Sequence, residues 1–136
     1  MFDARLESRM LSILRIMAGL LFMEHGTAKL LGFPPGTATP VLFGLAWFAG
    51  VIELIGGALV ALGLFTRYAA FIMSGEMAIG YFLVHAPQSF FPLLNRGEGA
   101  VLYCFLFLYL AVAGGGIWSL DRLIRGDKAT RRLSPA

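Results

Sequence analysis

The sequence predicts an all-α integral membrane protein whose four transmembrane helices form one antiparallel bundle. Of its 136 residues, 58% are hydrophobic and only 14% are charged, whereas a soluble domain has roughly 45–50% apolar and 25% charged residues. The mean hydropathy is +0.77. The apolar residues fall into four runs, each close to the ~20 residues that a bilayer crossing requires. These runs leave no room for a second domain, so residues 1–136 are expected to form a single membrane domain.

The first predicted span covers residues 10–31 and follows a short amphipathic segment typical of a helix that starts at the membrane interface. A cleaved signal peptide would also place an apolar run near the N-terminus. This run, however, carries Arg15 and continues into Glu24 and His25 without a small-residue cleavage site. We therefore interpret it as a helix that remains in the protein.

Three further spans are expected over residues 40–65, 67–86 and 97–118. Thr39 and Pro40 are typical of a helix N-cap followed by proline at the first helical position. Proline and glycine residues between the runs indicate the breaks.

The basic residues predict the orientation of the bundle. Five of the eleven lysines and arginines lie in the predicted tail, residues 119–136: Arg122, Arg125, Lys128, Arg131 and Arg132. With four spans both termini share one side, and the positive-inside rule places them in the cytoplasm. A basic segment directly after a span is typical of contact with anionic membrane lipid. We therefore expect membrane lipid, and no nucleic acid, as its partner.

Charged side chains inside the predicted spans are the candidates for function. One glutamate falls in each span, in the order Glu24, Glu53, Glu76 and Glu98. The first span also holds two cations, Arg15 and Lys29. A charge at the centre of a membrane helix costs roughly 2.5–3.5 kcal/mol on insertion scales. Such groups therefore have to pair, take up a proton or face a polar cavity.

Depth along each helix divides these candidates into two layers. The inner layer is expected to combine Arg15 with Glu53 and Glu76. The outer layer gathers the remaining polar side chains, which are His25, Lys29, His85, Glu98 and Glu24. Around Glu53, small residues form a stripe that lets membrane helices approach closely, so this carboxylate is expected to face the interior.

Structural interpretations of the same residues stay open. An ion pair of Arg15 with Glu53 or Glu76 explains their burial without any proton transfer. Glu98 follows Asn95 by three residues at a helix start, which is typical of a capping box.

His25 and His85 could ligate a haem iron, although hydrogen-bonded histidines are the simpler interpretation, and no other metal site is predicted. The single cysteine, Cys104, cannot form an intrachain disulfide. No catalytic residue can be assigned from these patterns alone.

Several stretches, in this order and spacing, form a specific combination over roughly residues 10–122. They are His25-Gly26-x-x-Lys29-Leu30-x-Gly32, Glu53-x-x-Gly56-Gly57 followed by Gly63 and Thr66-Arg67, Asn95-Arg96-Gly97-Glu98-Gly99-Ala100, and Gly114 to Gly116 before Ser119-Leu120-Asp121. In combination they resemble the DoxX family of small bacterial and archaeal membrane proteins.

The resemblance implies a four-helix bundle in the bacterial inner membrane and an association with quinone-linked oxidation. The family takes its name from a subunit of a quinol oxidase and thiosulfate:quinone oxidoreductase system. Some relatives resemble membrane anchors of oxidative-stress enzymes. We therefore expect a redox-associated membrane subunit that works with a quinone, with a haem as the second choice of cofactor, or with a partner redox enzyme. Whether the chain is itself an enzyme stays open.

Two other functions are compatible with the same residues. Membrane carboxylates also serve small proton-coupled transporters, although the basic neighbours found here fit a paired network better than a cation pocket. A non-catalytic membrane scaffold, alone or as a homo-oligomer, is the third interpretation.

Overall fold

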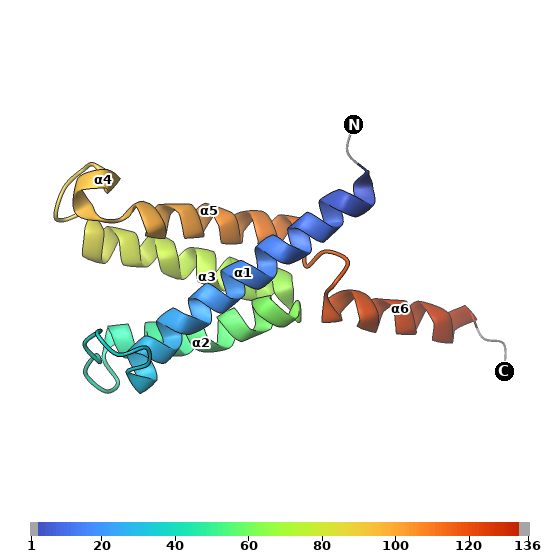
Figure 1. Ribbon diagram of the computed structural model, residues 1–136, viewed down its shortest axis with the longest axis horizontal. Helices are drawn as coiled ribbons and strands as arrows, with labels where there is room; N and C mark the ends of the chain where they lie inside the picture. The colour runs from blue at the N-terminus through green and yellow to red at the C-terminus, as the bar shows by residue number, and fades with distance from the viewer. Residues whose placement is uncertain (1–2, 134–136) are drawn as a thin grey trace.

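The computed structural model describes residues 3–133, and the side chains of residues 3–126; every regular element in this part is a helix (Figure 1). The elements are α1 (Ala4–Leu31), α2 (Leu45–Leu62), α3 (Thr66–Gly80), the π-helix η1 (Tyr81–His85), α4 (Pro92–Asn95), α5 (Glu98–Ala113) and α6 (Leu120–Leu133). The predicted all-α class is confirmed.

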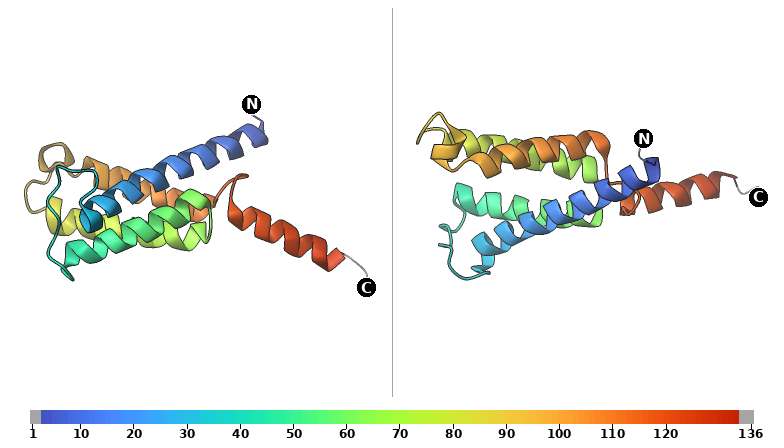
Figure 2. Two further views of the ribbon diagram at one scale, coloured as in Figure 1. Left: turned by 60° about the horizontal axis from the view of Figure 1, so that its bottom comes forward. Right: turned by 45° about the horizontal axis from the view of Figure 1, so that its top comes forward.

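The long helices form two packed pairs. Helix α1 lies along α2, α3 lies along α5, and the pairs meet mainly through α2 and α3. Figure 2 shows the α3–α5 pair as one layer over the α1–α2 pair. Both chain ends lie at the same end of the bundle, where α6 extends away from it (Figure 1).

The second helix starts later than the sequence indicates. It begins at Leu45 with Gly44 as its N-cap, so the predicted start at Thr39 and Pro40 is wrong. The reason is local, because Phe43 adopts a left-handed conformation with φ of 60° that a continuous helix cannot accommodate.

The third predicted span matches α3 and η1, which continue one another without a break. Helix α5 is shorter than the fourth predicted span, because it ends at Ala113 and Gly114 turns the chain with a φ of +86°. The predicted basic tail is largely helical, as α6. The side chains of Lys128, Arg131 and Arg132 lie outside the described part of the chain.

The distribution of polarity differs from that of a soluble bundle. Polar and charged side chains are buried, among them Arg15, Glu53 and Asn95, while large apolar side chains cover the outside of every long helix. The apolar core is small and centres on Phe22, Phe107 and their neighbours. Phe22 of α1 packs edge-on against Phe107 of α5, with ring centroids 4.5 Å apart, and so joins the two layers.

Within the described residues, α2 is the one helix both long enough and apolar enough to cross a membrane by length and composition alone. Helix α5 is apolar but has 16 residues. Helix α1 has 28 residues, with charged side chains at both ends and in its interior.

Candidate functional site

A partly buried ion pair joins α1 to α2. The Lys29 Nζ lies 2.6 Å from the Glu53 Oε1, and the Glu53 residue is only 2% exposed. Glycines allow α1 and α2 to approach each other closely. A Cβ on Gly50 would lie 2.9 Å from the Cβ of Lys29, and a Cβ on Gly26 would lie 2.5 Å from the backbone of Leu54. The predicted interior position of Glu53 is confirmed.

Glu76 of α3 completes a cluster with this pair, and we call Lys29, Glu53 and Glu76 the carboxylate cluster. Glu76 interacts electrostatically with both Glu53 and Lys29. Three buried carboxylate oxygens, Glu53 Oε2 and both of Glu76, have no hydrogen-bond partner in the described part of the chain. Buried polar atoms are almost always hydrogen-bonded, so these oxygens are available to a ligand or a proton.

Arg15 does not belong to this cluster, and its expected pairing with Glu53 or Glu76 is wrong. Its guanidinium is fully buried and donates to four backbone carbonyls, those of Val60, Ala61, Gly115 and Trp118. Two of these carbonyls belong to the last turn of α2, where the helix carries partial negative charge. Carbonyl dipoles thus replace the carboxylate that the sequence suggested.

These bonds also fasten the loop between α5 and α6 to α1. The Arg15 Nη2 lies 2.7 Å from the Trp118 carbonyl oxygen, and its Nε lies 2.8 Å from that of Gly115. The Trp118 N–H donates to the Ser12 Oγ at 3.2 Å. Arg15 therefore has a structural role in joining three segments that are distant in sequence.

The other predicted outer residues are not brought to the carboxylate cluster. Glu24 and His25 are exposed on α1, and Glu98 is exposed as the first residue of α5. The capping-box interpretation of Glu98 is wrong, because Gly97 is the N-cap of α5 and caps it without a side-chain hydrogen bond. Lys29, by contrast, pairs with Glu53 instead of staying in an outer layer.

His85 lies in a different environment from His25. The His85 Nδ1 is 2.9 Å from the Asn95 carbonyl oxygen, and its ring stacks on Tyr81. His25 makes an edge contact with the ring of Phe22. Across the described residues, no group of three or more histidine, cysteine, aspartate or glutamate side chains comes together as a metal site.

Asn95 organises the connection between η1 and α5, a role that the sequence did not reveal. Its fully buried amide donates to the Ser89 carbonyl at 2.8 Å and to the Tyr81 hydroxyl at 3.2 Å, and accepts from the Gly97 N–H at 2.8 Å. The one available signal was its place in the Asn95-Arg96-Gly97 motif.

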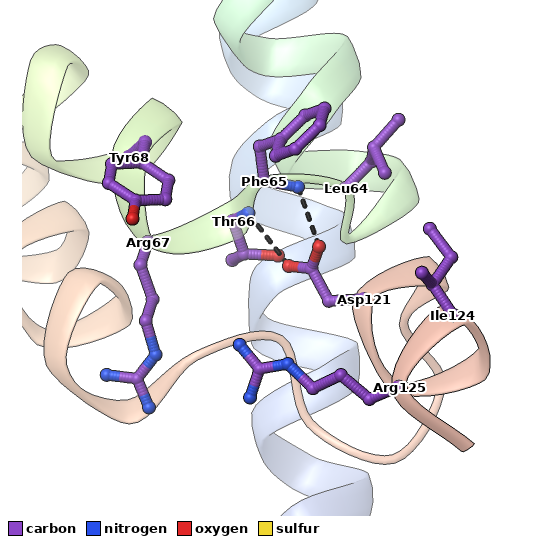
Figure 3. Close-up of a pocket in the computed structure, with 8 residues that line it drawn as sticks. All are labelled: Leu64, Phe65, Thr66, Arg67, Tyr68, Asp121, Ile124 and Arg125. Carbon is purple, nitrogen blue, oxygen red and sulfur yellow. Dashed lines mark hydrogen bonds between the residues drawn. The ribbon is translucent and has the colours of Figure 1, made fainter. Parts of the chain in front are cut away.

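Asp121 is a second residue whose role sequence reasoning missed. Its carboxylate accepts hydrogen bonds from the Phe65 N–H at 2.8 Å and the Thr66 N–H at 2.9 Å, and so caps α3 from α6 (Figure 3). These residues line a cavity of ≈ 280 Å³ together with Arg67 and Arg125. A cap supplied from 55 residues away leaves no local sequence signal.

The Asp121 cap predicts a pH-dependent stability. Burial raises the pKa of Asp121, but hydrogen bonds from Thr66 and Phe65 and the charge of Arg125 outweigh it, so the net pKa is below its ordinary value. The ionised cap therefore stabilises the fold fully above the unfolded pKa of about 4, and this contribution is lost as the pH falls through the folded pKa. We expect the Tm difference between wild type and Asp121→Asn to be largest near pH 7 and to shrink below about pH 4. Thermal unfolding in detergent from pH 3 to 7 measures it, and a constant difference would contradict the role of the cap.

Comparison with known proteins identifies the family of the chain. The family model described as DoxX matches residues 10–86. A protein of Haemophilus influenzae is 48% identical, over 82% of this chain and 87% of the relative. "Putative oxidoreductase CatD" of Bacillus subtilis is 28% identical, over 90% of this chain and 92% of the relative. Inner membrane protein YqjF of Escherichia coli is 27% identical, over 88% of this chain and 95% of the relative.

No solved structure gives a significant match to the chain. The family match covers more than half of the chain and includes all three members of the carboxylate cluster, Lys29, Glu53 and Glu76. Together with its relatives, this match establishes that the protein is a membrane protein and belongs to the DoxX family.

Proposed function

We propose that α1, α2, α3 with η1, and α5 each cross the inner membrane, with both termini in the cytoplasm. At about 1.5 Å per residue, the 18 residues of α2 extend about 27 Å, close to the roughly 30 Å hydrocarbon core. Helices α1 and α3 pack against α2, and α5 packs against α3. Large apolar side chains cover most of their outer surfaces, while Arg15 and Glu53 are buried. This inverted polarity favours lipid on all sides of the bundle.

Basic side chains support the orientation. Arg5, Arg9 and Arg122 lie in the segments next to the chain ends, and Arg67 lies at the α2–α3 corner on the same side. Arg96 is the cation of the connection between η1 and α5. This asymmetry follows the positive-inside rule.

Within this bundle, we propose a redox-associated membrane subunit in which the carboxylate cluster handles the protons of a bound quinone or quinol. The observation that carries the proposal is the set of three buried carboxylate oxygens that have no hydrogen-bond partner within residues 3–126. A protonated carboxyl donates a hydrogen bond to a quinone carbonyl, and a carboxylate accepts one from a quinol hydroxyl. The hydrogen-bonding groups of the cluster are therefore compatible with either form of such a head group.

Each residue of the cluster has a distinct part. Lys29 holds the Oε1 of Glu53 and leaves its Oε2 available. Glu76 offers two further acceptor atoms from α3. One ammonium against two carboxylates leaves the cluster one positive charge short, which a proton can supply.

Electrons have to leave by another route, because carboxylates and an ammonium carry protons and not electrons. We therefore propose a partner redox protein, in agreement with the CatD relative, whose name includes oxidoreductase. A pull-down in mild detergent, with identification of copurifying proteins, tests this part.

The quinone test uses tryptophan fluorescence. The chain has two tryptophans, so Trp118→Phe leaves Trp47, six residues before Glu53 on α2, as the sole reporter. We expect decylubiquinone to quench this fluorescence saturably, and Glu53→Gln or Glu76→Gln to weaken binding by about tenfold, the effect of losing one hydrogen bond of roughly 1.4 kcal/mol.

Glu98→Gln is the matched control, because this glutamate is exposed and we expect it to bind as wild type does. Glu53→Gln leaves the Lys29 ammonium without its partner, which by itself can destabilise the fold. The double variant Lys29→Met with Glu53→Gln removes both charges, and so separates a loss of binding from a loss of folding. Equal affinity in all variants would refute the quinone site. Proton release driven by an organic cation instead of a quinol would favour transport.

A further inference from the structure

A second cavity lies at the end of the bundle where both termini lie. It has a volume of ≈ 530 Å³ and is lined by the start of α1, the α5–α6 loop and the first turn of α6: Ala4, Arg5, Ser8, Ile117, Trp118 and Arg122. We call it the terminal cavity. It is separate from the carboxylate cluster and from the Asp121 cap.

Two guanidinium groups give the terminal cavity its charge. The side chains of Arg5 and Arg122 are exposed and make no hydrogen bond or ion pair within residues 3–126. The hydrogen bonds that these two residues do make are donated by their backbone N–H groups. Two neighbouring carboxylates are engaged elsewhere, because Asp3 accepts from the Arg5 N–H and Asp121 caps α3. No acidic residue lines the cavity. The cavity is therefore suited to an anion.

The walls of the terminal cavity are held in place by internal bonds. The Trp118 N–H donates to the Ser12 Oγ of α1, and its carbonyl accepts from the buried Arg15. The Arg122 N–H donates to the Ser119 Oγ at 3.3 Å. The backbone beside the cavity is therefore held in place at Trp118 and Arg122, which reduces the conformational entropy lost when a ligand binds.

We propose that the terminal cavity binds the phosphate group of an anionic phospholipid from the cytoplasmic leaflet. Arginine pairs with phosphate through two parallel hydrogen bonds. Trp118 is 53% exposed and lines the cavity beside Ile117, and an apolar wall with a tryptophan suits the glycerol and upper acyl chain of a lipid at the interface. A free phosphate ion would leave that wall without a contact. The proposal rests on the orientation given above and is independent of the redox role.

The experiment uses Trp118 as the reporter. In the Trp47→Phe variant of the full chain, Trp118 is the sole tryptophan, and its fluorescence is followed during titration with dioctanoyl phosphatidylglycerol in detergent. We expect saturable binding at least about tenfold tighter than for dioctanoyl phosphatidylcholine, and a loss of at least about tenfold in Arg5→Gln and in Arg122→Gln. Arg9→Gln changes the net charge equally at an exposed position of α1 that does not line the cavity, and is expected to bind as the parent does.

Three results would overturn the proposal. Glycerol phosphate binding as tightly as the lipid would indicate a site for soluble anions. Equal affinity for the anionic and the zwitterionic lipid would show that the arginines do not recognise charge. An equal loss in Arg9→Gln and Arg5→Gln would indicate diffuse electrostatic attraction. Circular dichroism verifies folding of each variant, and the quinone titration of the Trp118→Phe protein reports the other site separately.

Discussion

Replacing Arg15 with methionine is expected to lower the free energy of unfolding by at least about 3 kcal/mol, because a buried carbonyl left without a donor costs roughly 1–3 kcal/mol. Arg15 is fully buried and donates to four carbonyls from two distant segments. Methionine fills a similar volume but donates to none of them. Unfolding by sodium dodecyl sulfate in mixed micelles, followed by circular dichroism, measures the difference.

Two further variants calibrate this result. Arg15→Lys keeps the charge but loses the planar fork that reaches several carbonyls at once, so we expect an intermediate loss. Arg9→Met removes an exposed arginine of the same helix and is expected to change stability by less than about 0.5 kcal/mol. If Arg15→Met were as stable as Arg9→Met, the carbonyl-binding role of Arg15 would be wrong.

Placing an alanine at Gly57 is expected to separate α1 from α2. A Cβ there would lie 2.8 Å from the carbonyl oxygen of Gly19 and 2.8 Å from the backbone nitrogen of Met23. These are backbone atoms, so no side-chain rotation relieves the clash, and the loss is expected to reach or exceed the upper end of the roughly 1–3 kcal/mol typical of overpacking. The same unfolding titration detects it.

Gly75→Ala is the matched control for this substitution. Gly75 also lies inside a helix, but a Cβ there meets no atom within 4 Å. Alanine is favoured over glycine in a helix interior by roughly 0.5–1 kcal/mol, so this variant is expected to be as stable as wild type or more so. Equal stability of Gly57→Ala and Gly75→Ala would show that the helices do not need the close approach.

Helix positions were predictable wherever the apolar pattern was continuous. The third span agrees with α3 and η1 almost to the residue. The errors at Phe43 before α2, at Gly63 after it and at Gly114 after α5 fall where one backbone angle interrupts an apolar run. Hydropathy does not distinguish an apolar loop from an apolar helix, so the sequence placed these boundaries too far out.

The candidate site was predictable only in part. The stripe of small residues around Glu53 indicated an interior carboxylate, and Glu53 is buried. Its partner was assigned wrongly, because helical rise gives depth along one helix but not the crossing of two. Lys29, predicted in an outer layer, reaches Glu53 because α1 and α2 approach closely at Gly50 and Gly26.

The sequence by itself determined the helical class, the membrane character and the set of charged residues that the interior must accommodate. Composition and the length of the apolar runs are sufficient for this, because exposing polar or charged groups to lipid is costly. Only the tertiary structure decided which groups satisfy those charges. Arg15 is held by carbonyls 45 to 103 residues away. Every residue carries a backbone carbonyl, so no pattern of side chains could have indicated these partners.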